Sequence, residues 1–92
     1  MNEKFSCQRF IKLCLHTKSE KELRKLFDLF FTSEEKLNIE TRVLIVKELL
    51  QGNKPQREIA NDLGISIAKI TRGSNGLKLI DESLRNYLKR CL

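Results

Sequence analysis

Apolar residues recur at helical spacing through most of the 92-residue chain. In the segments 5–15 and 23–31 they fall three or four positions apart, which places them on one face of a helix. These positions are Phe5, Cys7, Phe10, Ile11, Cys14 and Leu15, and then Leu23, Leu26, Phe27 and Phe30. No segment shows the alternation of a β-strand, and four glycines with one proline argue against a turn-rich β fold.

Two pairs of residues have the spacing of a capping box, in which a hydroxyl and a Glu carboxylate bind free amides at a helix start. The pairs are Ser19 with Glu22 and Thr32 with Glu35. The second pair predicts a break near Phe31 and a new helix that runs to about Gln51. Gly52 suits the position after this helix, where a left-handed backbone is common.

The C-terminal part of the chain has three further helical segments. Asn53 to Pro55 form a polar turn, and a helix is predicted from about Gln56 to Gly64. The expected N-caps of the last two helices are Ser66 and Asp81, and the expected inner face of the last helix consists of Leu84, Tyr87 and Leu88. The sequence thus predicts an all-α fold of about six helices in a single domain, residues 1–92.

The charge balance favours an anionic partner. The chain has 18 basic and 12 acidic residues, a net charge of +6 and a pI near 9.5. Most of the excess follows residue 52, where eight residues are basic and four are acidic. A basic protein of this kind suits nucleic acid or another polyanionic surface.

The same composition excludes several classes of protein. An apolar content of 40% is too high for a disordered chain. The longest apolar runs, Leu29–Phe31 and Val43–Val46, are far shorter than a membrane span, and the N-terminus lacks the apolar region of a signal peptide. We therefore expect a cytoplasmic protein.

The residue types present indicate neither a metal site nor an enzyme active site. Cys7, Cys14 and Cys91 are odd in number and have no CxxC spacing, which suggests reduced thiols. His16 is the single histidine, so a His-based metal cluster is excluded. Because the sequence has neither a nucleophile–base pattern nor a phosphate loop, we expect no enzyme and no metal.

The segment Gln56–Thr71 has the features of a helix-turn-helix. Ala60 is small where two helices must cross closely, and Gly64 tolerates the positive φ of a tight turn. The apolar residues that would hold the two helices together are Ile59, Leu63, Ile65 and Ile70. An ordinary αα-hairpin is the alternative, but Lys69 near the second helix start opposes the helix dipole. A phosphate beside that helix start would relieve this conflict.

The helix-turn-helix also indicates which residues would contact DNA. Basic side chains bind phosphates, whereas methyl-bearing and polar side chains contact base edges in the major groove. The candidate phosphate contacts are Arg57, Lys69, Arg72 and Lys78. The candidates that face base edges are Ile67, Ala68, Lys69 and Thr71, and Gln56 completes the predicted DNA-binding set.

The hexapeptide Ile70–Asn75, ITRGSN, followed by Leu77 and Lys78, resembles the signature of the tryptophan repressor family. The resemblance extends from about Phe10 to Leu88. Further segments that fit the family pattern are Thr41–Val43, Ile45–Val46, Glu48–Leu50, Gln56–Glu58 and Leu63–Gly64.

This resemblance implies an intertwined homodimer in which residues 1–52 build the dimerisation core. Residues 56–76 would be the helix-turn-helix, and residues 80–92 the C-terminal helix. It also implies a sequence-specific repressor of tryptophan-related genes, which binds double-stranded operator DNA when L-tryptophan is present as corepressor. The alternative is a ligand-independent helix-turn-helix protein that a protein partner regulates.

The resemblance further implies a set of tryptophan-binding residues. Arg42 and Arg72 would stack on the two faces of the indole, and Arg72 would bind the carboxylate together with Thr32. Gly73 would allow the backbone to approach the ring. Carbonyls near Leu29 and Phe31 of the other subunit would hold the ammonium. The remaining members of the set are Val46 and Gly76.

Four positions depart from the family pattern. Gly76 replaces a serine whose hydroxyl helps to bind the ammonium, and Glu40 replaces a glycine near the carboxylate site. Lys69 replaces a threonine-like residue and Ala60 replaces a basic one. The preferred operator is therefore expected to differ from the operator of the family.

Overall fold

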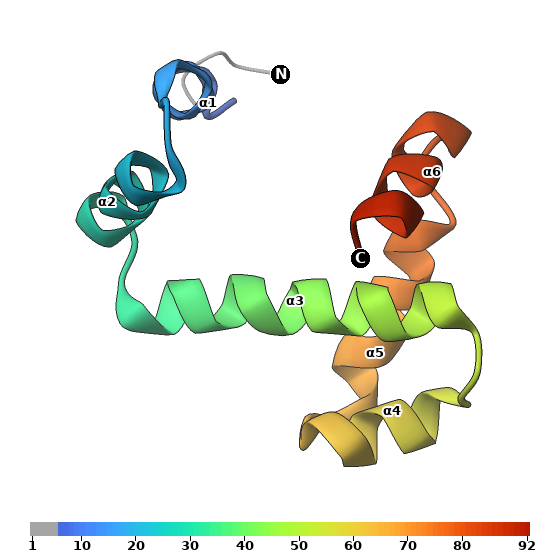
Figure 1. The fold of residues 1–92 in the computed structure, drawn as a ribbon. Coiled ribbons are helices and arrows are strands. Elements are labelled where there is room, and N and C mark those ends of the chain that lie inside the picture. Colours follow the sequence, from blue (N-terminus) through green and yellow to red (C-terminus); the bar gives the residue numbers. More distant parts are fainter. Residues whose placement is uncertain (1–5) are drawn as a thin grey trace. The chain divides into compact units, whose positions relative to one another are not determined.

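The computed structural model describes residues 6–92, which contain six α-helices and no strand. The all-α prediction is therefore confirmed (Figure 1). The helices are α1 Gln8–His16, α2 Glu20–Phe30, α3 Ser33–Gln51, α4 Gln56–Leu63, α5 Ile67–Leu77 and α6 Glu82–Cys91. Phe5, the first residue of the expected N-terminal pattern, lies outside the described residues. No helix within residues 6–92 is long and apolar enough to cross a bilayer.

The chain divides into two compact units, here called the N-terminal unit, which ends at Leu37, and the C-terminal unit, Asn38–Leu92. In the N-terminal unit, aromatic rings hold α1 against α2. The Phe10 ring lies 5.8 Å from the ring centroids of both Phe27 and Phe30, and 5.3 Å from that of Phe31. The last two contacts are edge-to-face, a favoured arrangement of aromatic pairs.

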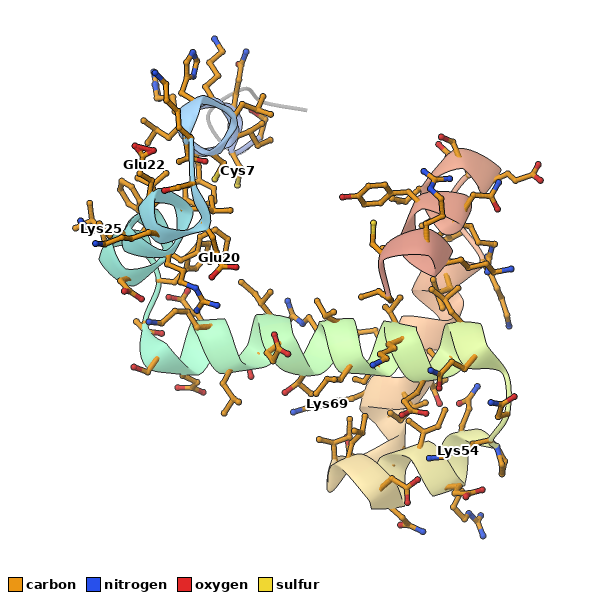
Figure 2. The ribbon with its side chains drawn as sticks, viewed as in Figure 1. Cys7, Glu20, Glu22, Lys25, Lys54 and Lys69 are labelled. Atoms are coloured by element: carbon orange, nitrogen blue, oxygen red, sulfur yellow. The ribbon has the colours of Figure 1, made fainter. Side chains whose placement is uncertain are left out.

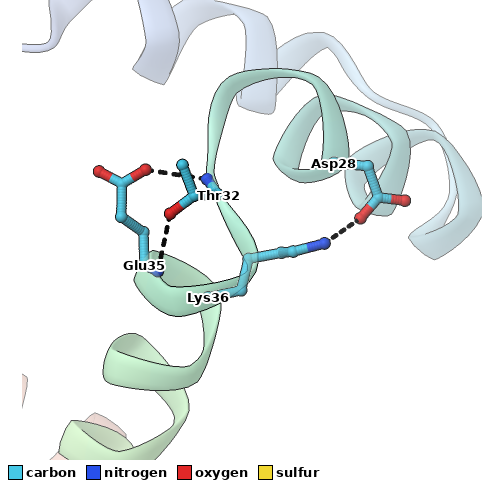
Figure 3. Close-up of polar contacts among 4 residues, drawn as sticks. All are labelled: Asp28, Thr32, Glu35 and Lys36. Atoms are coloured by element: carbon cyan, nitrogen blue, oxygen red, sulfur yellow. Dashed lines mark hydrogen bonds and ion pairs between the residues drawn. The ribbon is translucent and has the colours of Figure 1, made fainter.

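Both capping boxes form in the N-terminal unit. The Glu22 amide donates to Ser19 Oγ over 3.1 Å, and the Glu22 carboxylate accepts from the preceding Lys18 amide over 2.8 Å. At the start of α3 the exchange is reciprocal. The Glu35 amide donates to Thr32 Oγ1 over 3.1 Å, and the Thr32 amide donates to Glu35 Oε1 over 2.8 Å (Figure 3). These caps explain why α2 ends where α3 begins.

An ion pair reinforces the same turn. Lys36 Nζ lies 2.7 Å from Asp28 Oδ1, so the first turn of α3 is tied to the last turns of α2 (Figure 3). Both side chains are partly exposed, so the pair contributes little on its own. It spans the same turn as the Thr32 cap.

The core of the C-terminal unit is small. The cluster of buried residues consists of Ile45 on α3, Ile59 and Ala60 on α4, and Ile70 on α5, with Leu49, Leu63 and Ile65 packed against it. Ala60 is buried where α4 meets α5, and Gly64 adopts a φ of 67° in the turn between them. The helix-turn-helix geometry expected from the sequence is therefore present.

The last two helices begin differently from each other. Asp81 Oδ1 accepts from the Leu84 amide over 2.7 Å, so the predicted cap of α6 is confirmed. Ser66 occupies the N-cap position of α5, but its side chain forms no capping bond, so that part of the prediction is wrong. At the other end of α5, the Arg85 guanidinium donates to the Leu77 carbonyl, where a cation suits the negative end of the helix dipole.

The expected inner face of α6 is only partly buried in the single chain. Leu88 is half-buried, but Leu84 is 43% and Tyr87 54% exposed. The prediction that all three face inward is therefore wrong for one chain by itself. Helical spacing identifies an apolar face without identifying what covers it.

The two N-caps give a direct test of helix capping in this fold. Replacing Asp81 with Ala removes the bond to the Leu84 amide and should lower the free energy of unfolding by about 1 kcal/mol. Ser66→Ala is the matched control, because Ser66 forms no capping bond, and it should change stability by a few tenths of a kcal/mol at most. Urea unfolding at equal protein concentration measures both, and equal losses would contradict the assignment.

Candidate ligand pocket and reading helix

A pocket of about 450 Å³ lies in the C-terminal unit, with walls from α3 and α5. This volume is typical of sites for small molecules. The residues that line it from α3 are Asn38, Thr41, Arg42, Ile45 and Val46. Those from α5 are Lys69, Arg72, Gly73, Gly76 and Leu77, and Ile80 and Leu88 complete the lining.

Two glycines of α5 shape the pocket in different ways. A Cβ on Gly73 would lie 2.8 Å from Ile45 Cγ2 and 3.5 Å from Leu49 Cδ1, so the absence of a side chain lets α5 approach α3 closely. A Cβ on Gly76 would meet nothing within 4 Å. The first glycine thus permits the contact between the helices, and the second leaves open space in the pocket wall.

The lining combines an apolar surface with positive charge. Arg42, Lys69 and Arg72 all reach it, whereas the lining residues include no Asp or Glu. None of the ion pairs within residues 6–92 involves these three cations. The site therefore suits a ligand with an apolar body and an acidic group. In the same described range, no cluster of His, Cys, Asp and Glu side chains has the arrangement of a metal site.

The structure brings together the ligand-binding candidates that belong to the C-terminal unit. They are Arg42, Val46, Arg72, Gly73 and Gly76, and all five line the pocket. Lys69, which the sequence suggested as a DNA contact, also lies on this wall. Sequence reasoning missed the other lining residues, among them Ile45 and Leu77, although both belong to segments that fit the family pattern.

The other three candidates belong to the N-terminal unit. Leu29 is 74% exposed on α2. The Phe31 ring packs against Phe10 and Phe27, and the Thr32 hydroxyl accepts the capping bond at the start of α3.

The helix α5 presents two different faces. Lys69, Arg72, Gly73 and Gly76 follow the spacing i, i+3, i+4, i+7, so they share the face that lines the pocket. The base-reading candidates Ile67, Ala68 and Thr71 follow the spacing i, i+1, i+4 on another face, and all three are exposed. Lys69 is therefore separated from the other base-reading candidates. Lys78, at the C-cap of α5, is exposed.

A hydrogen bond joins two of the predicted DNA contacts. The Thr71 hydroxyl donates to Gln56 Oε1 over 3.0 Å and so connects α5 to the start of α4. Arg57, the next residue on α4, is exposed. Thr71 is exposed as well, whereas Gln56 is partly buried.

Lys54 holds the first helix of this motif in place. Its Nζ lies 2.6 Å from Asp62 Oδ2 on α4 and 3.8 Å from Glu48 Oε2 on α3. The hydrogen bond to Asp62 raises the pKa of Lys54 above its ordinary value, so the side chain stays charged. One lysine thus bridges α3 and α4 from the turn between them.

Comparison with known proteins gives a consistent result along nearly the whole chain. The family model described as Trp repressor protein matches residues 6–92. A Trp operon repressor homolog of Chlamydia trachomatis serovar D is 42% identical over 88 residues, which cover 96% of this chain and 94% of that protein. Homologs of the same name from Vibrio vulnificus and Xylella fastidiosa are 39% and 32% identical, covering 92% and 98% of this chain and 83% and 96% of theirs.

The two glycines of α5 allow the close approach at Gly73 to be tested. Gly73→Ala forces a methyl group against the buried Ile45 side chain, which should cost about 1–3 kcal/mol of overpacking. Gly76→Ala is the matched control, since it adds the same helix propensity where there is open space, and it should stabilise by about 0.5–1 kcal/mol. Thermal unfolding separates the two variants, and equal melting temperatures would contradict the close approach.

Proposed function

Because this chain belongs to the Trp repressor protein family, whose members regulate transcription and are not enzymes, we propose that it represses tryptophan-related genes by binding operator DNA. L-tryptophan is the proposed corepressor. The main observation that supports the proposal is that α5 has two faces with different surroundings. One face of this helix lines the pocket, and another exposes Ile67, Ala68 and Thr71 to a partner.

The pocket has the chemistry that a tryptophan ligand needs. The guanidinium planes of Arg42 and Arg72 can stack on an indole, and Arg72 can form charge-assisted hydrogen bonds with the carboxylate. Val46 supplies apolar contact, and Gly73 lets the backbone approach the ring. Gly76 lacks the hydroxyl that family members use for the ammonium, and open space replaces it.

The DNA-binding surface is proposed to lie across α4 and α5. The exposed Ile67, Ala68 and Thr71 would face base edges in the major groove, where methyl groups contact thymine. The side chains proposed to bind phosphates are Gln56, Arg57 and Lys78, all at helix ends. This division follows the general rule that phosphate contacts orient a protein and base contacts give specificity.

A homodimer is proposed because the single chain leaves much apolar surface uncovered. Leu15, Leu29, Leu37 and Leu79 are between 65% and 87% exposed. A second copy that packs against residues 1–52 would cover the first three and enlarge a thin core. In that dimer, carbonyls near Leu29 and Phe31 of one subunit would hold the ligand ammonium of the other. The cytoplasm is the expected location, since the target is DNA.

Tryptophan is proposed to act by a population shift. Without ligand, α5 samples several orientations against α3. A ligand between Arg42 and Arg72 stabilises the orientation in which both subunits can contact the operator. A ligand shifts such an equilibrium only by the difference in its affinity for the two states. Because the states differ in the orientation of α5, the ligand's contacts with α5 determine how far the equilibrium shifts.

An operator shift assay tests this function. With a palindrome like those of tryptophan operons, tryptophan should tighten binding by about 5-fold to 150-fold, the usual range of allosteric coupling. Arg42→Ala removes a stacking partner from α3 and should reduce this gain, whereas Arg9→Ala, an exposed position on α1, should keep it.

Two outcomes would change the assignment. No binding to any palindrome, with or without ligand, would contradict the repressor. Equal binding with and without tryptophan would favour the ligand-independent alternative, which the missing hydroxyl at Gly76 supports.

A further inference from the structure

We propose that Lys69 is a ligand-binding residue that makes the pocket select for a carboxylate, so that among ligands with the same ring, affinity rises as the net charge becomes more negative. The inference rests on the function proposed above, because it concerns the same pocket. It assigns to Lys69 a role in ligand choice in place of the base contact expected from the sequence.

Lys69 lies on the face of α5 that lines the pocket. Lys69 lies three residues before Arg72 and four before Gly73, which places all three on the pocket face of the helix. Its side chain extends from α5 alongside α3 (Figure 2). The face with Ile67 and Thr71 points elsewhere, because each residue advances about 100° around the helix, although Lys69 and Arg72 are exposed too.

The charge around Lys69 is not compensated within the described part of the chain. Among residues 6–92, no carboxylate pairs with Lys69, Arg42 or Arg72, whereas Lys36 and Lys54 each pair with a nearby Asp. The first turn of α5 contains no acidic residue either. Three unpaired cations therefore face one apolar cavity, and the positive potential there is larger than two arginines would give.

Ligands with one ring but different charges should respond differently to this potential. A monoanion is attracted to Lys69, while in a zwitterion the ammonium cancels part of the attraction to the carboxylate. A monocation is repelled. Because Lys69 is exposed, solvent screens its charge, and each unit of ligand charge should change affinity by only about threefold.

Calorimetry on the full chain with tryptamine, L-tryptophan and indole-3-propionate tests the proposal. These ligands share the indole ring and carry net charges of about +1, 0 and −1 at neutral pH. In Lys69→Gln, the ratio of the association constants of indole-3-propionate and tryptamine should fall about tenfold, and tryptophan should lie between them. Lys89→Gln is the control, because Lys89 is exposed on α6 and does not line the pocket.

The outcomes separate this inference from the function on which it rests. An unchanged ratio in Lys69→Gln overturns the role of Lys69, and it leaves the corepressor intact if tryptophan still strengthens operator binding. A Lys69→Gln variant that alters only the salt dependence of operator binding assigns the lysine to a phosphate and also overturns the inference. If the wild-type chain binds none of the three ligands, the corepressor and the role of Lys69 fail together.

Discussion

The close approach of α5 to α3 at Gly73 is the constraint on which the C-terminal unit depends. A side chain at this position would begin 2.8 Å from the Ile45 methyl, so the helices approach this closely because the residue is a glycine. Ile45 and Ile70 are buried beside this contact. The pocket that Arg42 and Arg72 line has walls from the same two helices.

In the proposed function the same helix serves two purposes, because its residues point in different directions. Its pocket face has positive charge and glycines, and another face has Ile67, Ala68 and Thr71. A molecule that fills the pocket touches α3 and α5 at once and so changes the stability of one orientation of α5. This is a physical basis for ligand control of DNA binding that needs no long chain of contacts.

Local sequence patterns predicted most of the fold. Ser19, Thr32 and Asp81 cap the helices as expected, since each cap depends on residues only three positions apart. The turn at Gly64 followed from the need for a positive φ. The exposure of Leu84 and Tyr87 could not be predicted from the sequence, because helical periodicity does not indicate whether a face is covered by the same chain or by another.

The pocket was harder to predict from the residues alone. Arg42 and Arg72 are 30 positions apart, and only their resemblance to a family signature connected them before the structure placed both on one cavity. Lys69 is an example of a residue whose contacts could not be predicted from its charge. Its charge suggested DNA, but its direction on α5 is toward the pocket, and direction depends on how α5 packs against α3.

A nuclear Overhauser measurement between bound L-tryptophan and the isotope-labelled protein shows directly whether the ligand occupies the pocket. If tryptophan binds between α3 and α5, the indole protons should contact the methyl groups of Ile45 and Val46 and the α protons of Gly73. Contacts only with the phenylalanine cluster of α1 and α2, or none at saturating ligand, would contradict it.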